Sequence, residues 1–358
     1  MWKSLKDRAE GVKEMKRMKT TEAVGQVLCH DITQIIPGVT KDAVFRKGHI
    51  IREEDKPVLL SVGKDSVYIW ENDETMMHEN DAAEVLYRMT ANEHMHPSDV
   101  KEGKIEAIAD TEGLLKVDRE KLKKVNAFGE MMIATRHGNT VVKKGDKLAG
   151  TRIIPLVIKK DKMQEAEKIC DGTPILKILP FTVKKAAIIT TGNEVYHGRI
   201  KDAFTPVIEQ KIAEFGAEMM FHEIFDDNDR KITDGCLRAI EAGADIVFCT
   251  GGMSVDPDDK TPLAIKNTGA EMISYGSPVL PGAMFLLSYY RKGDKVIPIC
   301  GLPGCAMYNR RTIFDLVLPR LMAADPVTAD ELASLGEGGL CLNCKVCTFP
   351  NCGFGKGW

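Results

Sequence analysis

The chain has 358 residues, of which 44% are hydrophobic and 28% charged, with a net charge of −3. This length exceeds what one ordinary domain holds, so we expect two or three domains. The slightly negative charge excludes a global positive field that would hold nucleic acid or an anionic membrane surface. The first twenty residues are charged throughout, and no run approaches the ~20 apolar residues of a membrane span. The sequence therefore predicts a cytoplasmic protein without a secretory signal or membrane partner.

Composition changes along the chain and predicts four regions. They are a mixed α/β region (residues 1–95), a β-rich middle domain (96–182), an α/β domain (183–330) and a linker with a Cys-rich tail (331–358). In the first region, the pattern predicts a strand over Thr21–Thr33, a helix over Arg52–Leu60 capped by Gly63, and a strand over Val67–Trp70. Short apolar runs punctuated by Gly and Asp predict the β-rich middle domain.

From Val183 onward, strand-like and helix-like stretches alternate. Continuous apolar runs at residues 184–190, 219–225, 244–250 and 295–300 are typical of buried parallel strands, and amphipathic stretches separate them. A long helix is expected over Cys305–Ala323. The fold class predicted here is a three-layer α/β domain with a mostly parallel sheet. On such sheets, ligands bind beyond the carboxyl ends of the strands.

Three loops follow predicted strands and carry residues suited to an anionic ligand. The first is Thr190-Thr191-Gly192-Asn193-Glu194, the second runs from Thr250-Gly251-Gly252-Met253-Ser254-Val255 to Asp259, and the third is Gly301-Leu302-Pro303-Gly304. Paired glycines allow backbone N–H groups to approach a phosphate, and hydroxyl groups add donors. A Gly-Gly turn after a strand is common without such a role, so the prediction depends on all three loops occurring in order.

Acidic residues beside these loops predict a divalent cation. The carboxylates of Glu194 and Asp259 would repel a bare phosphate unless a cation, most simply Mg²⁺, lies between them and the ligand. Asp227 follows the next predicted strand and joins this set.

The ordered motifs resemble the molybdopterin-binding domain shared by the MoaB/Mog proteins, MoeA proteins and the gephyrin E domain. The MoeA type shows S-T-G-D-E, S-G-G-V-S-x-G-x-x-D and L-P-G-N-P, where this chain has T-T-G-N-E, T-G-G-M-S-V-D-P-D-D and L-P-G-C-A. The likeness covers Lys185–Met322, and Asp259–Pro262 is similar to the Mog version of the second loop. The chain looks like a divergent MoeA-like subgroup of this family with a Cys-rich tail.

The resemblance implies that the domain binds molybdopterin or its adenylate together with Mg²⁺. MoeA-type enzymes insert molybdate and cleave the adenylate, whereas Mog-type proteins make that adenylate. The implied catalytic residues are Glu194, Asp227 and Asp259. The implied cofactor-binding residues are Thr190, Thr191, Gly192, Thr250, Gly251, Gly252, Ser254, Pro281, Gly282, Leu302, Pro303 and Gly304.

Several departures from the family pattern weigh against transfer of molybdate more than against binding of the pterin. Asn193 replaces the family's Asp, and Cys305-Ala306 replaces Asn-Pro. Residues 280–284 keep Pro-Gly but lack both lysines of the segment thought to hold molybdate. The leading expectation is a molybdopterin molybdenumtransferase-like enzyme. The alternatives are a non-catalytic cofactor carrier or insertion partner for a molybdoenzyme, and a nucleotide-binding regulator. Related systems imply a homo-oligomer.

The tail carries four cysteines at metal-ligand spacing, Cys341, Cys344, Cys347 and Cys352. In a cytosolic chain such spacing predicts one metal centre rather than disulfides. Zinc and an iron–sulfur cluster both remain open. The compact run resembles ferredoxin-type spacing, whereas zinc sites usually separate two C-x-x-C knuckles. The proline at 350 precedes the last cysteine, which is not the ferredoxin order.

Overall fold

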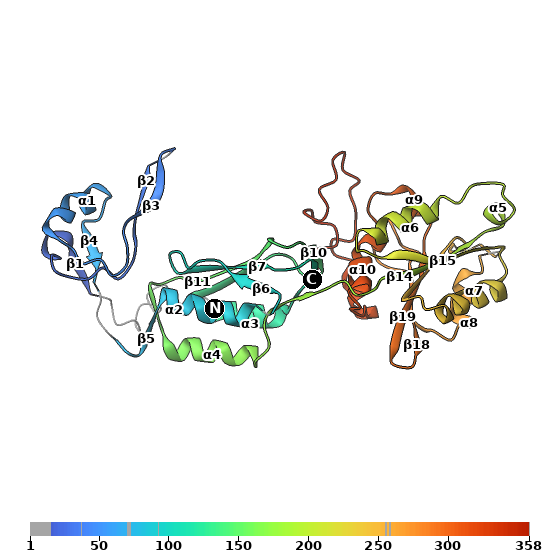
Figure 1. Ribbon diagram of the computed structural model, residues 1–358, viewed down its shortest axis with the longest axis horizontal. Helices are drawn as coiled ribbons and strands as arrows, with labels where there is room; N and C mark the ends of the chain where they lie inside the picture. Colours follow the sequence, from blue (N-terminus) through green and yellow to red (C-terminus); the bar gives the residue numbers. More distant parts are fainter. Residues whose placement is uncertain are drawn as a thin grey trace.

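The computed structural model describes residues 16–36, 38–69, 73–91, 93–254, 256–257 and 259–357. Figure 1 shows an elongated arrangement in which the N-terminal strands, the middle region and the C-terminal α/β part follow one another along the long axis. The first part contains β1 (Arg17–Lys19), η1 (Thr20–Glu22), β2 (Ile32–Ile36), β3 (Thr40–Phe45), η2 (Glu53–Asp55), α1 (Lys56–Ser61) and β4 (Ser66–Tyr68).

The predicted elements of this first part are only partly confirmed. The helix expected at Arg52–Leu60 is present as η2 and α1, and Gly63 follows it with a φ of 77°. The continuous strand expected over Thr21–Thr33 is wrong, because η1 begins this stretch and Gly25 takes a positive φ of 80° that interrupts an extended chain. The last predicted strand is present as β4, and Trp70 lies outside the described residues.

The middle region combines strands with three helices. Its elements are β5 (Met76–His78), α2 (Glu79–Thr90), β6 (Met95–Pro97), β7 (Lys104–Ala109), β8 (Gly113–Val117), α3 (Arg119–Ala127), β9 (Met131–Thr135), β10 (Thr140–Val142), β11 (Lys147–Ile153), β12 (Val157–Lys159), α4 (Lys160–Cys170) and β13 (Leu176–Leu179). An antiparallel sheet has the order β6-β7-β11-β9, and a second has the order β10-β8-β13.

The sequence predicted a β-rich middle domain and did not predict the helices α3 and α4. The start of α3 is fixed by Asp118, whose carboxylate accepts a hydrogen bond of 3.0 Å from the backbone N–H of Lys121. Leu86 of α2 and Met163 of α4 are fully buried in one core with Leu148 of β11. This core includes residues on both sides of the boundary predicted at 95/96.

The C-terminal part is the expected α/β fold. Its elements are β14 (Lys185–Thr191), α5 (Asn193–Tyr196), α6 (Phe204–Ala213), β15 (Glu218–Phe225), α7 (Asp229–Glu241), β16 (Ile246–Thr250), α8 (Thr261–Asn267), β17 (Glu271–Tyr275), β18 (Leu286–Lys292), β19 (Lys295–Leu302), α9 (Cys305–Tyr308), α10 (Ile313–Met322) and α11 (Ala329–Ser334). Six strands form one sheet in the order β15-β14-β16-β19-β18-β17. The first four are parallel, and β18 and β17 extend the sheet as antiparallel strands.

Helices cover both faces of this sheet, as Figure 1 shows on its right-hand side. On one face, α6 and α10 bury Ile208 and Phe314 against Phe248 of β16. On the other face, α7 and α8 bury Ile232 and Ile265 against the sheet. Since every strand in the middle of this sheet is buried on both faces, the continuous apolar runs in the sequence are explained.

The long helix predicted over Cys305–Ala323 is wrong, because the structure divides it into α9 and α10. Thr312 begins α10 with a capping box: its hydroxyl accepts from the N–H of Phe314 at 3.2 Å, and the carboxylate of Asp315 accepts from the N–H of Thr312 at 2.8 Å. The extended backbone of Asn309 ends α9.

The C-terminal segment packs against the α/β core. Phe354 is 5% exposed and belongs to the same core cluster as Phe314. Gly355 lies against Leu316, where an added Cβ would be 3.0 Å from Cδ1. Gly339, within the range predicted as a linker, is also closely packed, because an added Cβ would lie 2.6 Å from the carbonyl oxygen of Leu335. Among the described residues, no helix combines the length and apolar character needed to cross a membrane.

Candidate functional site

The three predicted loops meet at the carboxyl edge of the sheet. Parallel pairing places Thr190 beside Thr250, and Thr250 beside Leu302. The ends of β14, β16 and β19 are therefore neighbours, and the first, second and third loops leave the sheet from adjacent strands.

The first two loops are joined by direct contacts. The hydroxyl of Thr191 donates to the carbonyl oxygen of Thr250 at 3.1 Å and lies 3.0 Å from the hydroxyl of Thr261. The hydroxyl of Thr261 donates to the carbonyl oxygen of Gly251 at 2.9 Å. Gly251 has a φ of 82°. A Cβ added to Gly251 would lie 3.0 Å from Thr191 Oγ1 and 2.9 Å from the carbonyl carbon of Thr191. Only glycine fits this approach, so the second loop is closed upon the first.

The second loop is held from within and from a neighbouring strand. The carboxylate of Asp259 accepts a 2.7 Å hydrogen bond from the backbone N–H of Ser254. Tyr275, at the end of β17, donates its hydroxyl to the carbonyl oxygen of Met253 at 3.2 Å. Burial, followed by the charge of Asp259, raises the pKa of Tyr275, so this hydroxyl keeps its proton at neutral pH. Val255 and Asp258 of this loop lie outside the described residues.

The third loop contacts the second through a sulfur. A Cβ added to Gly301 would lie 2.5 Å from Met253 Sδ, so glycine at this position makes room for the Met253 side chain. Pro303 and Gly304 continue directly into α9, where the N–H of Met307 donates to the carbonyl oxygen of Gly304 at 3.2 Å. All three loops thus form one continuous surface at the sheet edge.

The predicted acidic residues occupy different positions on this surface. Asp227 accepts a 3.2 Å hydrogen bond from the backbone N–H of Asn193 and so ties the first loop to the end of β15. Glu194 is exposed, and its Oε2 lies 3.6 Å from the position of a Cβ on Gly192. In the ranges that the structure covers, no three His, Cys, Asp or Glu side chains form a group that would hold a metal ion. The structure does not bring Glu194, Asp227 and Asp259 together as a closed set of ligands.

Two buried polar atoms lack a hydrogen-bond partner within the described residues, and both belong to this edge. They are Thr250 Oγ1, at the end of β16, and Asp226 Oδ1, directly after β15. The other oxygen of Asp226 pairs with Lys231 Nζ at 2.8 Å. Unsatisfied buried groups are rare in folded proteins and call for an explanation such as water, an ion or a ligand.

The sequence did not predict a polar network behind the first loop. The hydroxyl of Thr190 donates to Asp202 at 3.0 Å and lies 3.1 Å from His222 Nε2. Thr205 donates to the same carboxylate at 2.6 Å. Burial raises the pKa of Asp202, but the hydrogen bonds from Thr205 and Thr190 more than offset burial, and the net pKa is lower than usual. The hydroxyl of Thr190 is therefore already hydrogen-bonded within the protein, although the sequence predicted that it binds the ligand.

Pro281 and Gly282 also have structural partners. The carbonyl oxygen of Pro281 accepts from the N–H of Ile313 at 3.1 Å. A Cβ added to Gly282 would lie 2.9 Å from Ile313 Cβ. This segment precedes β18, whose first residue, Leu286, pairs with Gly301, so it lies at the carboxyl end of β19.

Two cysteines near the site are not activated nucleophiles. Cys249 is fully buried in β16, where a contact of 3.6 Å with the sulfur of Cys236, followed by burial, raises its pKa. Burial also raises the pKa of Cys305, which begins the four-residue helix α9.

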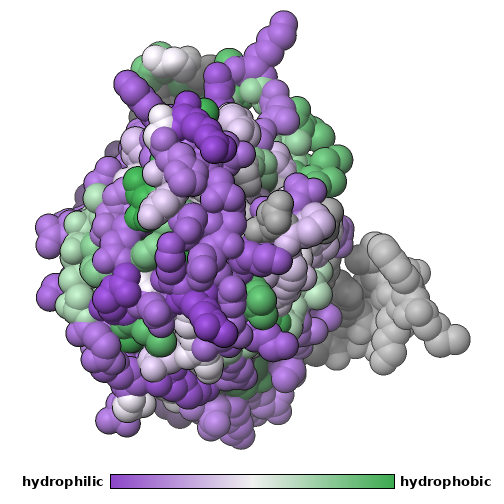
Figure 2. All heavy atoms as spheres, turned by 90° about the vertical axis from the view of Figure 1, so that its right-hand side faces the viewer, coloured by the Kyte–Doolittle hydropathy of each residue, from purple (hydrophilic) through white to green (hydrophobic). Residues whose placement is uncertain are grey.

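Figure 2 looks onto the end of the molecule formed by the α/β domain, and hydrophilic residues cover most of that face. This surface suits a polar or charged ligand better than an extended apolar partner.

Two family models match parts of the chain. Residues 17–71 match a family described only as a domain of unknown function (DUF8806). Residues 187–323 match a family described as "Probable molybdopterin binding domain", and this range includes all three loops. The matched range lies within the C-terminal α/β part of the chain. The MoeA-like subgroup is not confirmed by these matches.

The curated relatives match part of this chain. A "Putative competence-damage inducible protein" of Bacillus cereus (strain B4264) is 30% identical over 129 residues, which is 36% of this chain and 30% of the relative. The protein of the same name from Bacillus subtilis (strain 168) is 32% identical over 85 residues, which is 24% of this chain and 20% of the relative. The chain therefore spans less than a third of the length of these relatives.

Solved structures with related folds include the tungsten cofactor synthesizing protein MoaB from Pyrococcus furiosus. It is 20% identical and covers 39% of this chain and 89% of its own, with a TM-score of 0.32. A molybdenum cofactor biosynthesis protein from the same organism is 12% identical and covers 88% of this chain and 66% of its own, with a TM-score of 0.26. At these TM-scores the likenesses carry no argument about function.

Proposed function

We propose that the protein acts in molybdenum cofactor assembly by binding molybdopterin or its adenylate at the carboxyl edge of the α/β sheet. The observation that supports this most strongly is the closure of the Gly251-Gly252 turn on Thr191, within a domain whose family is described as molybdopterin-binding. Backbone N–H groups of such a turn, without Cβ atoms in front of them, are suited to a phosphate.

The donor set at this edge fits a phosphate and a magnesium ion. Thr250 Oγ1 is a hydroxyl without a partner among the described residues, and Ser254 follows in the same loop. Asp259 is oriented by the Ser254 N–H through one carboxylate oxygen, which leaves its other oxygen for a cation. Mg²⁺ is commonly held by one or two carboxylates together with phosphate oxygens of the ligand, so a closed protein cage is not required. When bound, Mg²⁺ would neutralise charge on the phosphate.

We further propose that the protein is an enzyme that inserts molybdate and releases AMP from the adenylate. The test is AMP release by the full chain from adenylylated molybdopterin with molybdate and Mg²⁺. Asp259→Asn keeps size but removes the charge, so turnover should be abolished while ligand binding weakens less. Asp256→Asn is the matched control, since it removes one charge from an exposed position of the same loop and should leave turnover near the wild-type rate.

A non-catalytic carrier is the second candidate, and a specific observation favours it. The Pro281-Gly282 segment lacks lysines, and its backbone is engaged by Ile313 rather than turned to a ligand. If the wild-type protein binds the pterin but never releases AMP, the enzyme is ruled out and the carrier is supported. Binding of a nucleotide without any pterin would overturn both and favour a nucleotide-binding regulator.

A further inference from the structure

The C-terminal tail and its neighbours expose an apolar patch. Among the described residues, no three Cys, His, Asp or Glu side chains come together as a group that would hold a metal ion, the four tail cysteines included, so the metal centre expected from their spacing stays a prediction. Five large apolar side chains of this region are between 55% and 78% exposed, and we call them the tail patch. They are Leu280, Tyr308, Leu340, Leu342 and Val346.

The tail patch surrounds one surface pocket. The volume of this pocket is about 590 Å³, and Tyr308, Leu340 and Leu342 line it. Val346 directly follows Lys345, another lining residue. Contiguous apolar surface is uncommon on monomeric proteins and marks sites of interaction. The tail patch therefore indicates a surface that a partner covers.

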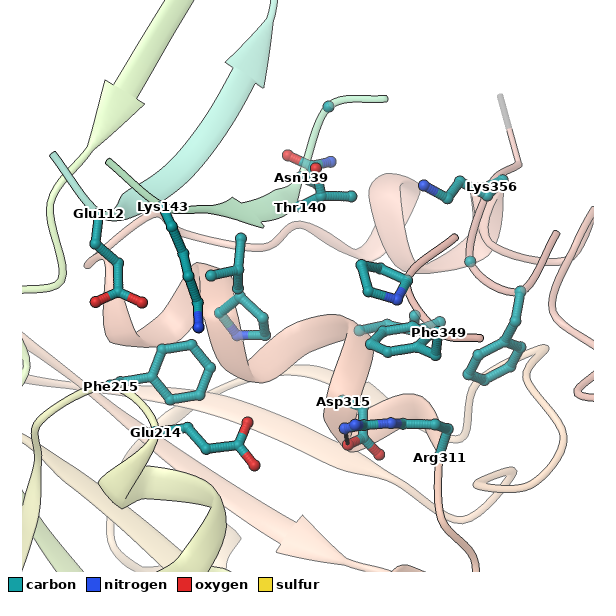
Figure 3. A pocket seen from close by; sticks show the side chains of 17 residues that line it. Glu112, Asn139, Thr140, Lys143, Glu214, Phe215, Arg311, Asp315, Phe349 and Lys356 are labelled. Atoms are coloured by element: carbon teal, nitrogen blue, oxygen red, sulfur yellow. Dashed lines mark hydrogen bonds and ion pairs between the residues drawn. The ribbon is translucent and has the colours of Figure 1, made fainter. Parts of the chain in front are cut away.

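The wall of the pocket is positively charged. Arg310, Arg311 and Lys345 line it, and the described lining residues include no Asp or Glu. Figure 3 shows the ring of Phe349 over Arg311 and Asp315 beside the guanidinium, and the 2.8 Å ion pair with Asp315 balances the charge of Arg311. Arg310 and Lys345 are exposed and have no acidic partner in the part of the chain that the structure describes. Two uncompensated positive charges beside apolar side chains favour carboxylates from outside the chain.

The tail also offers a free strand edge at Leu340. On one side, Leu340 forms a parallel bridge with Leu280, which donates its N–H to Gly339 and accepts from the N–H of Cys341, each at 2.8 Å. In such a bridge the N–H and C=O groups of Leu340 itself point away from Leu280. Neither group has a hydrogen-bond partner among the described residues. A free edge of this kind can pair with an added strand.

We propose that the tail patch binds an extended, acidic segment of a partner protein. The apolar side chains of that segment would cover Leu340 and Leu342, its carboxylates would face Arg310 and Lys345, and its backbone would pair with Leu340.

Three other occupants fit these features less well. A two-fold contact with a second copy of this chain would bring the same positive charges together, which opposes binding. Nucleic acid would match the charges but leave the five apolar side chains in water. A lipid surface would leave the free N–H and C=O groups of Leu340 without partners.

The partner would lie next to the candidate pterin site. Tyr308 of the tail patch ends α9, the four-residue helix that begins directly after the third loop. Four helical residues rise about 6 Å, so one short helix separates the tail patch from the third loop. A protein that accepts the cofactor is therefore the expected class of partner. This last step rests on the proposed function, whereas the docking surface itself does not.

The test measures the binding of two fluorescein-labelled peptides to the full chain by fluorescence anisotropy. One peptide alternates Glu and Val over about eight residues, the length of a strand, and the other has Lys in place of Glu. We expect only the acidic peptide to bind, and we expect its affinity to fall as salt is raised, because salt screens exposed charges.

Substitutions of exposed side chains test each part of the surface. Leu342→Ser should weaken binding of the acidic peptide about tenfold, and Lys345→Glu about fivefold. Ile154→Ser and Lys266→Glu are the matched controls, since they change exposed side chains of the middle region and of α8, and both should keep the wild-type affinity. All four variants should keep the wild-type circular dichroism.

Several outcomes would overturn the proposal. Equal binding of the two peptides, or unchanged affinity in both tail-patch variants, would refute the acidic segment. Binding of phosphatidylserine vesicles or a DNA oligonucleotide without the acidic peptide would assign the surface to a membrane or to nucleic acid. Self-association that is lost in Leu342→Ser would assign it to a second copy.

Pterin binding measured on the same samples separates the two proposals. A protein that binds pterin but not the acidic peptide refutes only the docking surface. A protein that binds the acidic peptide but no pterin supports the docking surface and refutes the proposed function.

Discussion

Replacing Gly251 by alanine perturbs the contact that closes the second loop upon the first. The substitution adds a methyl group 3.0 Å from Thr191 Oγ1 and 2.9 Å from the Thr191 carbonyl carbon, and closer still to its oxygen. It also places alanine at a φ of 82°. We expect the α/β domain to lose stability and the Gly251-Gly252 turn to open.

The magnitude follows from two separable effects. A non-glycine residue at positive φ costs roughly 1–2 kcal/mol, of which about 0.4–1 kcal/mol is recovered because alanine restricts the unfolded chain. Overpacking adds about 1–3 kcal/mol. Gly269→Ala is a control for the first effect alone, since its φ is 83° and nothing lies within 4 Å of an added Cβ. Gly251→Ala should therefore cost about 2–4 kcal/mol and Gly269→Ala about 1 kcal/mol.

Hydrogen exchange at increasing urea concentration, read on peptides from β14 and β16, gives the free energy of unfolding of this domain by itself. Equal losses in the two variants would refute the close approach of the loops. Pterin or phosphate binding should also be lost in Gly251→Ala and retained in Gly269→Ala. Wild-type affinity in Gly251→Ala would refute the role of the turn in binding.

Three further predictions concern the surroundings of the site. Asp315, only 4% exposed at its side chain, pairs with Lys211 and Arg311, so Asp315→Ala should lower the free energy of unfolding by ~3–5 kcal/mol, and a loss below 1 kcal/mol would contradict a buried ion pair. The folded pKa of Asp202 is below its unfolded value of about 3.9, so its stabilisation is present above that pH and lost as pH falls through the lower folded value. The stability gap between the wild type and Asp202→Asn should narrow below about pH 4 in urea titrations, and a constant gap would refute the assignment. Phe354→Ala should release the tail from the core, which would be detected as faster tryptic cleavage at Lys345. Unchanged cleavage would mean that other contacts hold the tail.

The sheet and the meeting of the three loops were predictable because both follow from local patterns. Apolar runs such as residues 244–250 indicate buried parallel strands, and parallel strands bring their carboxyl ends to one edge. The antiparallel strands β17 and β18 were missed because Leu286–Lys292 and Glu271–Tyr275 mix apolar and polar residues. The two-residue turn Gly293-Asp294, which joins β18 to β19, was a hairpin signal that the sequence analysis did not use. The break between α9 and α10 had a signal in the capping pair Thr312 and Asp315, which the apolar periodicity of the stretch concealed.

Other features had no signal in the sequence because they depend on tertiary contacts. His222 reaches Thr190 only through the pairing of β14 with β15, and Asp202 comes from the loop before α6. The tail is a further example. The spacing of its cysteines is visible in the sequence, but the packing of Phe354 depends on tertiary contacts with α10. The predicted roles of Glu194, Asp227 and Asp259 stay predictions. Because these carboxylates lie apart, a cation shared between them would need oxygen atoms of a ligand to complete its coordination.

Mass spectrometry of the small molecules bound to anaerobically purified full-length protein tests the central claim most directly. The site at Gly251 and Gly252 predicts molybdopterin or its adenylate in near-stoichiometric amount in the wild type, and little in Gly251→Ala. A nucleotide without pterin, or no pterin even after incubation with molybdopterin and Mg²⁺, would contradict the claim.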